Sequence, residues 1–421
     1  MNVVCVCVCI PLLAIAAAVA VVAGQGPLDR PIDGDGRYYI ALARAMASGK
    51  GYMLEASTGD PWPDRPHLSS LPLWPLMLTP GEWLFPHANE FTVLRSTAIF
   101  FHGIAASLLA LFTYRMWRDL AAAFLAGVLF ALYPPALALV DEGMSEHSYV
   151  VTATAGFLLL FTNRPGPAAD WKAMAGAGLL GLSALARGNI LLLPFFFAGI
   201  GLALQPSLCR HWKRMAILTI IFLTPATFWI LRNYHVSGEF PVLSAVEGET
   251  FYGGNNAFVA TDLTNWGYWT FPNNIPGETP KFELAKRMNE IELNRYYKQK
   301  GMEYIRENWF AYPRLILGKL IRGFVPVPFV PVKATYLAFL IRLILYIAFL
   351  RALRRRIIQD QLFLYLLIAL FAVTVATTLI YYGTYRFTFC LEIYMICCVA
   401  ASLVNAWRHW RTRGADSPIP V

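Results

Sequence analysis

The stretch "VVCVCVCIPLLAIAAAVAVVA" at residues 3–23 decides the fold class. It contains no charged residue, and about 20 mostly apolar residues are enough for a helix to cross the hydrocarbon core of a bilayer. Similar runs recur along the 421-residue chain, which is 57% hydrophobic and 14% charged, with a mean hydropathy of +0.49. Soluble proteins carry about 25% charged residues. We therefore predict an all-α polytopic membrane protein.

About ten transmembrane helices are predicted from these runs. The predicted spans lie at 3–23, 91–114, 120–140, 144–162, 172–187, 189–206, 213–232, 334–350, 361–382 and 387–406. The first has no basic segment before it and no convincing cleavage site after it, so we interpret it as a retained helix and not as a signal peptide. Residues 172–206 allow one long helix or two helices that meet at Arg187-Gly188. Two are preferred, because a single helix would export the basic run at 351–356.

The basic connectors support this layout. Arginine and lysine gather after every second span, at 115–118, 164–172, 210–214, 351–356 and 408–413. By the positive-inside rule these connectors lie in the cytoplasm, together with both termini. The net charge of +9 therefore reflects membrane topology, and a nucleic-acid partner has no support.

Two long polar segments then lie on the extracytoplasmic face of the cytoplasmic (inner) membrane, and they divide the chain. The predicted parts are 1–232, a catalytic transmembrane module with a first long loop at 24–90; 233–333, a second long loop with an amphipathic helix; and 334–421, C-terminal transmembrane helices with a cytoplasmic tail. The cysteines lie in apolar spans or in a basic connector, so no disulfide framework is expected.

Within the long loops, three local structures are predicted. A helix begins at Asp35 and ends at Gly49 and Gly51. The stretch 61–78 holds prolines and aromatic residues that disfavour a regular span, so we expect it along the membrane interface. A charged helix is expected at about 279–309, followed by an amphipathic stretch at 315–332 that also suits the interface.

Carboxylates at the extracytoplasmic ends of the spans are candidate catalytic groups, because a carboxylate can accept a proton from an attacking hydroxyl. Asp33 and Asp35 occur in "DGDGRYYIALARAM" at 33–46, and Glu146 lies in an otherwise apolar run. Asp35 begins a helix, where aspartate is also a favoured N-cap. If its oxygens bond backbone N–H groups, the base must be sought at Asp33 or Glu146.

Arginines from separate segments reach the same predicted face. Their planar guanidinium groups match phosphate oxygens, although snorkelling toward lipid headgroups is the alternative role. The candidates for binding a phosphate or lipid-linked donor are Arg65, Arg187, Arg232 and Arg386. The candidates for contacting substrate are Tyr39, Tyr385, Asn255 and Asn256, although the spacing of "GGNN" at 253–256 by itself favours a plain turn.

His147, next to Glu146, is a weak candidate metal ligand. No second histidine follows at the spacing of a common metal motif. The sequence therefore names no certain cofactor and leaves a divalent metal open.

A series of motifs follows in order along nearly the whole chain. It comprises "DGRYYIALARAMASGKGY" (35–52), "PLWPLML" (72–78), "YPPALALVDEGMSEHSY" (133–149), "LARGNILLLP" (185–194), "RNYHVSGEFPVLSAVEGETFYGGNN" (232–256), "IRENWFAYPRLILGKLIR" (305–322) and "YRFTF" (385–389). Together they resemble the polyprenol-phosphate-sugar-dependent glycosyltransferases of the GT-C superfamily. That group includes bacterial relatives of protein O-mannosyltransferases and of aminoarabinose transferases acting on lipid A.

The resemblance implies a GT-C-like membrane fold and a mechanism. A sugar on a polyprenyl-phosphate carrier would be transferred, with inversion, to a lipid, glycan or protein at the extracytoplasmic face. Asp35 would act as general base or orient the acceptor. Arg187, Arg232 or Arg386 would stabilise the leaving polyprenyl phosphate. Gly188, in place of a family proline, leaves the shape of the lipid and acceptor cavities open.

Some relatives hold a divalent metal with a glutamate and a histidine. Glu146 and His147 are adjacent here, so this ligand set is not carried over. Two alternative functions stay open. A flippase or transporter of a lipid-linked saccharide would show inverted repeats with charges near the bilayer midplane. A ligase or polymerase with a diphosphate-linked donor would share the arginines without needing the Asp35 loop.

Overall fold

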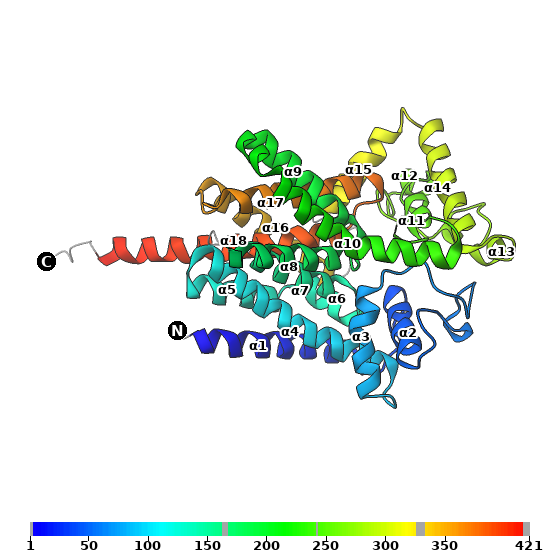
Figure 1. The fold of residues 1–421 in the computed structure, drawn as a ribbon, viewed down its shortest axis with the longest axis horizontal. Helices are drawn as coiled ribbons and strands as arrows, with labels where there is room; N and C mark the ends of the chain where they lie inside the picture. The colour runs from blue at the N-terminus through cyan, green and yellow to red at the C-terminus, as the bar shows by residue number, and fades with distance from the viewer. Residues whose placement is uncertain (1–2, 162–166, 241–242, 326–332, 416–421) are drawn as a thin grey trace.

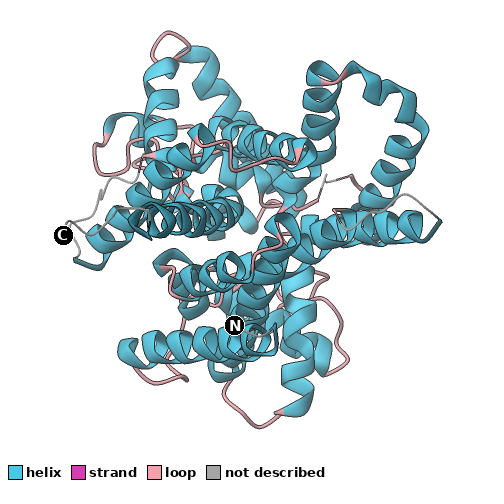
Figure 2. Ribbon diagram, turned by 90° about the vertical axis from the view of Figure 1, so that its left-hand side faces the viewer, coloured by secondary structure: helices cyan, strands magenta, loops and turns pink. Residues whose placement is uncertain are grey.

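The computed structural model describes residues 3–161, 167–240, 243–325 and 333–415. Within these ranges the regular structure is helical, with no strand and a single isolated β-bridge between Met53 and Pro66 (Figure 2). The all-α prediction is confirmed.

Within the described residues, the helices differ widely in length. They are α1 Val3–Gln25, α2 Asp35–Ala47, α3 Leu73–Leu84, α4 Glu90–Trp117, α5 Leu120–Ala131, α6 Pro134–Asp141, α7 Glu146–Leu160, α8 Pro167–Ala184, α9 Leu193–Leu204, α10 Trp212–Ser237, α11 Glu247–Gly253, α12 Ala257–Thr261, α13 Lys281–Ala285, α14 Glu290–Glu307, α15 Tyr312–Phe324, α16 Lys333–Arg354, α17 Gln361–Ile380 and α18 Tyr385–Ala415. Short 3-10 helices are η1 Ala56–Thr58, η2 Gly188–Leu192, η3 Pro206–His211 and η4 Pro272–Asn274.

Each predicted span coincides with one or more helices over most of its described residues, but the helices are not equally long. Among the described residues, 6 helices are long and apolar enough to cross a membrane, or up to 7 if the bent pair α5–α6 counts as one span. The bend of 48° between α5 and α6 falls at Leu132 and Tyr133, just before Pro134 and Pro135. Proline removes a backbone donor and disfavours a continuous helix, so the span breaks there. The remaining predicted spans coincide with the shorter helices α7, α8 and α9.

The chain between α8 and α9 turns at Arg187. This residue has φ −137° and ψ 94°, which is an extended conformation, and α8 has already ended at Ala184. The prediction of two helices in 172–206 is therefore confirmed.

The two long loops lie at one end of the helix bundle and both termini at the other (Figure 1). We call these the loop end and the terminal end. At the terminal end, the Trp117 indole donates to the Ile357 carbonyl at 2.9 Å, and Arg408 pairs with Asp119 at 2.6 Å. These two contacts place the segments that carry the basic connectors at 115–118 and 351–356 close to one another and to α18 at the terminal end.

In the first long loop, residues 73–84 form the helix α3, which is not among the described helices long and apolar enough to cross a membrane, and the fully buried Trp74 anchors it to the bundle. One prediction in the second long loop is wrong. The expected helix at 279–309 is two helices, α13 and α14, because Asn289 caps α14 by accepting from the backbone N–H groups of Ile291 and Glu292. The amphipathic stretch is α15 and ends at Phe324, and residues 326–332 lie outside the described part of the chain.

Candidate active site

Asp35 is the first residue of α2, and Gly34 occupies the N-cap position with φ 84°. The side chain of Asp35 is 52% exposed, and its Oδ2 accepts from Nη1 of Arg386 at 3.3 Å. The capping role that the sequence left open for Asp35 therefore falls to a glycine. Its carboxylate points toward a cation and stays accessible from outside.

The chain before α2 is tied to the bundle by a buried arginine. Arg95 in α4 is 1% exposed, and its Nη1 donates to the carbonyls of Leu28 (2.6 Å) and Arg30 (2.7 Å). Arg30 in turn forms an ion pair with Asp141 at the end of α6. These contacts fix where the first long loop leaves the bundle, and so fix the start of α2.

Gly36 lets α2 approach the connector between α6 and α7. A Cβ at this position would lie 2.5 Å from the carbonyl oxygen of Glu142 and 3.2 Å from Ile32. A larger side chain would therefore push α2, with Asp35, away from α7. This is the structural reason for the glycine that follows Asp35 in the sequence.

Glu146 is the first residue of α7 and is fully buried. Its Oε1 accepts from Nε of Arg386 at 2.6 Å and from Nη1 of Arg187 at 3.1 Å. Its Oε2 has no hydrogen-bond partner among the described residues. We refer to Asp35, Glu146, Arg187 and Arg386 as the Arg386 cluster. It joins four segments that are far apart in the sequence.

The two arginines of the cluster are held by their surroundings. Arg187 donates from Nη2 to the carbonyl of Arg386 at 3.4 Å, and its guanidinium lies 5.7 Å from the centre of the Phe387 ring. A guanidinium on an aromatic face gains a cation–π attraction. Arg187 and Arg386 therefore keep a fixed relation to each other and to Glu146.

The two tyrosines predicted to contact substrate flank this cluster. Tyr39 lies one turn after Asp35, and burial together with the Asp35 charge raises the pKa of its phenol. Tyr39 is therefore a neutral hydrogen-bond donor at physiological pH. Tyr385 is the half-buried first residue of α18 and directly precedes Arg386. Asp33, by contrast, is exposed and two residues before α2.

The other two candidate arginines lie in different surroundings. Arg232 donates from Nη1 to the carbonyl of His67 at 2.7 Å and lies 5.4 Å from the Tyr52 ring and 4.9 Å from the Trp229 ring. It holds the first long loop in place. Arg65 is exposed and lines a surface hollow together with residues 285–289. The structure thus brings together Arg187 and Arg386, and not all four arginines.

Asn255 and Asn256 are buried and bonded inside the protein. Asn255 donates to the carbonyls of Phe251 and Ile380, at 2.7 and 3.0 Å. Asn256 is the N-cap of α12 and accepts from the backbone N–H of Val259 at 3.1 Å. The "GGNN" segment is therefore built into the fold, which corrects the expectation that its side chains face substrate.

His147 faces into the bundle, where its Nε2 lies 3.1 Å from Nδ1 of His102. His102 directs Nε2 to the carbonyl of Ala131 at 3.1 Å, so its Nδ1 is an acceptor and His147 donates to it. No group of three His, Cys, Asp or Glu side chains in the described ranges is placed to hold a metal ion. The weak metal assignment to His147 does not fit this geometry, and we derive no step through a metal.

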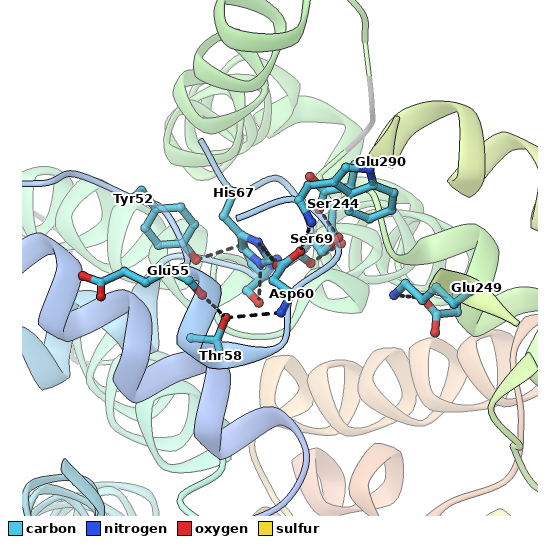
Figure 3. A network of polar contacts seen from close by, with 12 residues as sticks. Tyr52, Glu55, Thr58, Asp60, His67, Ser69, Ser244, Glu249 and Glu290 are labelled. Carbon is cyan, nitrogen blue, oxygen red and sulfur yellow. Dashed lines mark hydrogen bonds and ion pairs between the residues drawn. The ribbon is translucent and has the colours of Figure 1, made fainter. Parts of the chain in front are cut away.

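The first long loop is joined to the second by a separate polar network (Figure 3). Asp60 lies 3.6 Å from Nδ1 of His67, and hydrogen bonds from the His67 side chain and the Trp62 backbone hold the pKa of Asp60 below its usual value, against the effect of burial. Ser244 donates to the carbonyl of Ser69 at 2.5 Å. This network keeps the two loops together over the loop end of the bundle.

Neither a family model nor a curated protein sequence matches this chain. Solved structures do. The archaeal oligosaccharyltransferase AglB from Archaeoglobus fulgidus, in complex with an inhibitory peptide and a dolichol-phosphate, covers 99% of the chain with a TM-score of 0.51 and 11% identity. The Archaeoglobus fulgidus oligosaccharyltransferase tethered to an acceptor peptide covers 96% of the chain with a TM-score of 0.53 and 12% identity.

The chain has the GT-C fold. It spans about half of each archaeal enzyme, 52% and 50% of their lengths. ArnT from Cupriavidus metallidurans, bound to undecaprenyl phosphate, is more distant, with a TM-score of 0.45, 12% identity and coverage of 93% of this chain and 76% of that one. At these identities the likeness concerns the fold, and the function must be argued from the site.

Two neighbours of the site were not among the sequence-predicted residues. Phe387 supports Arg187, and Lys319 contacts the segment that leads to Arg386. An aromatic residue in "YRFTF" gives no signal of its own in an apolar run. Lys319 did carry one, because a lysine on the buried side of an amphipathic helix is rare without a partner.

Proposed function

We propose that this multi-pass membrane protein is a glycosyltransferase that moves a sugar from a polyprenyl-phosphate carrier to an acceptor. The observation that carries the proposal is the Arg386 cluster, in which an accessible carboxylate and two guanidinium groups face one another at the loop end of the bundle. The fold supports it, because the archaeal enzyme of the same fold was solved with a dolichol-phosphate.

Exposure separates the roles of the two carboxylates. Asp35 is 52% exposed, whereas Glu146 is fully buried between two arginines. Only Asp35 is open to an acceptor, so we assign it as the general base. Glu146 holds Arg187 and Arg386 in place and keeps both charged side chains from separating.

The proposed reaction is a single displacement. The acceptor hydroxyl or amine gives its proton to the Asp35 carboxylate while its oxygen or nitrogen bonds to the anomeric carbon. The bond from that carbon to the phosphate oxygen breaks, and its electron pair stays on the polyprenyl phosphate. Attack opposite the leaving group inverts the anomeric configuration.

The arginines stabilise the leaving phosphate. Arg386 uses Nε on Glu146 and Nη1 on Asp35, and we assign its Nη2 to a phosphate oxygen. Donors that are already in place where negative charge develops lower the barrier without reorganisation. In this proposal the loop end faces outward from the cytoplasmic membrane, and the basic terminal end faces the cytoplasm.

The test uses the full chain in liposomes containing undecaprenyl phosphate linked to radiolabelled hexoses or pentoses. Release of undecaprenyl phosphate and transfer of label to added lipids, glycans and peptides are measured. Asp35→Asn should lower turnover at least about 100-fold, since a positioned base contributes about 10²–10⁴. Asp33→Asn is the matched control, two residues away and exposed, and should keep activity.

Full activity of Asp35→Asn would remove Asp35 as the base. Loss in Asp33→Asn alone would move that role to Asp33. Movement of the intact lipid-linked sugar across the bilayer, with no bond cleavage, would replace the enzyme by a flippase.

A further inference from the structure

We infer that Lys319 and Asn255 are positioning residues that set the place of Arg386. They do so by holding the connector between α17 and α18, residues 381–384, from the second long loop. This inference rests on the proposed function, since it assigns these residues an effect on the proposed chemistry. It gives the buried "GGNN" segment a role that substrate contact does not explain.

Lys319 lies on α15 and is fully buried. Its Nζ donates to Oδ1 of Asn255 at 2.7 Å and to the carbonyl of Leu379 at 3.2 Å. The Tyr312 ring lies 5.5 Å away. Within the described ranges no carboxylate pairs with this ammonium group, so its partners are all neutral oxygens and one aromatic face.

Asn255 continues the same contact to the next carbonyl. Its Nδ2 donates to Ile380 at 3.0 Å, while its Oδ1 accepts from Lys319 and from the Tyr312 hydroxyl at 2.8 Å. The last carbonyls of a helix lack partners within the helix. Lys319 and Asn255 therefore satisfy two successive carbonyls at the end of α17, with side chains that come from a distant segment.

Close backbone contacts enclose the connector itself. A Cβ at Gly254 would overlap the carbonyl of Tyr381, and a Cβ at Gly383 would overlap the carbonyl of Lys319. The N–H of Gly383 also donates to the carbonyl of Gly267 at 2.9 Å. Contacts from the second long loop therefore hold the connector in place along its length.

Arg386 is the second residue of α18 and follows this connector directly. Its Nε lies 2.6 Å from Glu146, so a displacement of about 1 Å is enough to lose the hydrogen bond. A shift of that size in a catalytic group can cost about 100-fold in rate. The contacts that hold residues 379–383 therefore control whether Arg386 faces Asp35 and Glu146.

The chemistry of Lys319 argues against simple packing. Burying an ammonium group without a carboxylate is unfavourable, and burial lowers the pKa of Lys319 to about 7. An apolar side chain of similar length would fill the same space without that cost. What the lysine adds is a donor long enough to reach Leu379 and Asn255 together.

The experiment compares Lys319→Met with Lys319→Arg and with the control Lys286→Met, an exposed lysine that pairs with the exposed Glu283. Turnover of undecaprenyl-phosphate sugars by the full chain is expected to fall at least about tenfold in Lys319→Met, mainly in kcat, because Arg386 acts on the transition state. Lys319→Arg keeps N–H hydrogen-bond donors at this position and should recover part of the lost turnover. Lys286→Met should match the wild type.

A double-mutant cycle separates positioning from general damage. If Lys319 acts through Arg386, Lys319→Met should have little further effect in an Arg386→Lys background. Equal losses in both backgrounds would overturn the inference, as would unchanged kcat in Lys319→Met. If Lys319→Met does not fold, an Asn255→Leu variant that folds and keeps wild-type kcat would also overturn it.

Hydrogen exchange of residues 379–386 provides a readout that does not depend on activity. Faster exchange of this segment in Lys319→Met, with no change in Lys286→Met, supports the positioning role even if no tested sugar donor is cleaved. The absence of donor cleavage would then refute the proposed function and leave the positioning role supported. Unchanged exchange in Lys319→Met would refute the positioning role, whatever the activity.

Discussion

Nε of Arg386 lies 2.6 Å from Oε1 of Glu146, although 240 residues separate them in the chain. The same guanidinium reaches Asp35 from its Nη1. One side chain of α18 therefore connects the start of α7 with the start of α2. The geometry of the proposed site depends on this contact more than on either carboxylate alone.

Arg386→Lys is expected to lower donor cleavage by about 100-fold or more. A lysine ammonium is a point charge and cannot reproduce the planar fork that bonds Glu146 and Asp35 at once. The protein should still fold, because the ammonium can pair with Glu146. Turnover of undecaprenyl-phosphate sugars measures the effect, with Arg65→Lys, an exposed arginine outside the cluster, as control. An equal loss in Arg65→Lys would contradict the assignment.

Much of the fold was predictable because it follows from composition along the chain. Apolar runs marked every predicted span, and the positive-inside rule favoured a break at Arg187, because a single helix would have exported the basic run at 351–356. Basic connectors also predicted which helix ends lie together. The bend before Pro134 was not predicted, because a proline in an apolar run does not always break the helix: Pro11 and Pro225 lie inside the continuous helices α1 and α10.

The site was only half predictable, because the direction of a side chain depends on contacts between distant segments. Arg187, Arg232 and Arg386 all stand at the ends of apolar runs. Only the packed structure shows that Arg232 holds the first long loop while the other two share Glu146. Asn255 likewise had the composition of a turn, and its side-chain oxygen accepts from Lys319, which lies 64 residues away.

Glu146→Gln is expected to destabilise the fold. The change leaves Arg187 without a carboxylate partner among the described residues and leaves Arg386 with the exposed Asp35 alone. Breaking a buried ion pair in this way costs about 3–5 kcal/mol. A fall of several degrees in Tm, measured by thermal unfolding in detergent, is expected. Removing one of the stranded charges as well, in Glu146→Gln with Arg187→Met, should recover part of the loss.

Glu142→Gln is the matched control for this prediction. Glu142 is an exposed carboxylate at the C-cap of α6, four residues before Glu146, and the structure shows no ion pair to its side chain among the described residues. Its Tm should stay close to that of the wild type. Equal Tm values for Glu142→Gln and Glu146→Gln would show that the buried pairs add no stability.

The pH dependence of stability should change in Lys319→Met. Burial lowers the pKa of Lys319 to about 7 in the folded protein, while an unfolded lysine has a pKa of about 10.4. Between these values the unfolded chain binds more protons, so stability rises with pH. Below pH 7 both states are charged, and the cost of burial is fully present. The Tm of the wild type should therefore rise relative to that of Lys319→Met between pH 7 and 9. Parallel curves of Tm against pH for the two proteins would contradict this prediction.

Gly156→Val should weaken the protein by separating α7 from α8. A Cβ at Gly156 would lie 2.9 Å from the Gly176 carbonyl, and a Cβ at Gly176 would lie 2.7 Å from the Gly156 carbonyl. Small residues let membrane helices approach this closely. Because α7 carries Glu146, both Tm and donor cleavage should fall.

Gly199→Ala is the control, since no atom lies within 4 Å of a Cβ there among the described neighbours. Alanine favours a helix over glycine by about 1 kcal/mol, so the Tm of Gly199→Ala should equal or exceed that of the wild type. A wild-type Tm in Gly156→Val would refute the close packing of α7 against α8.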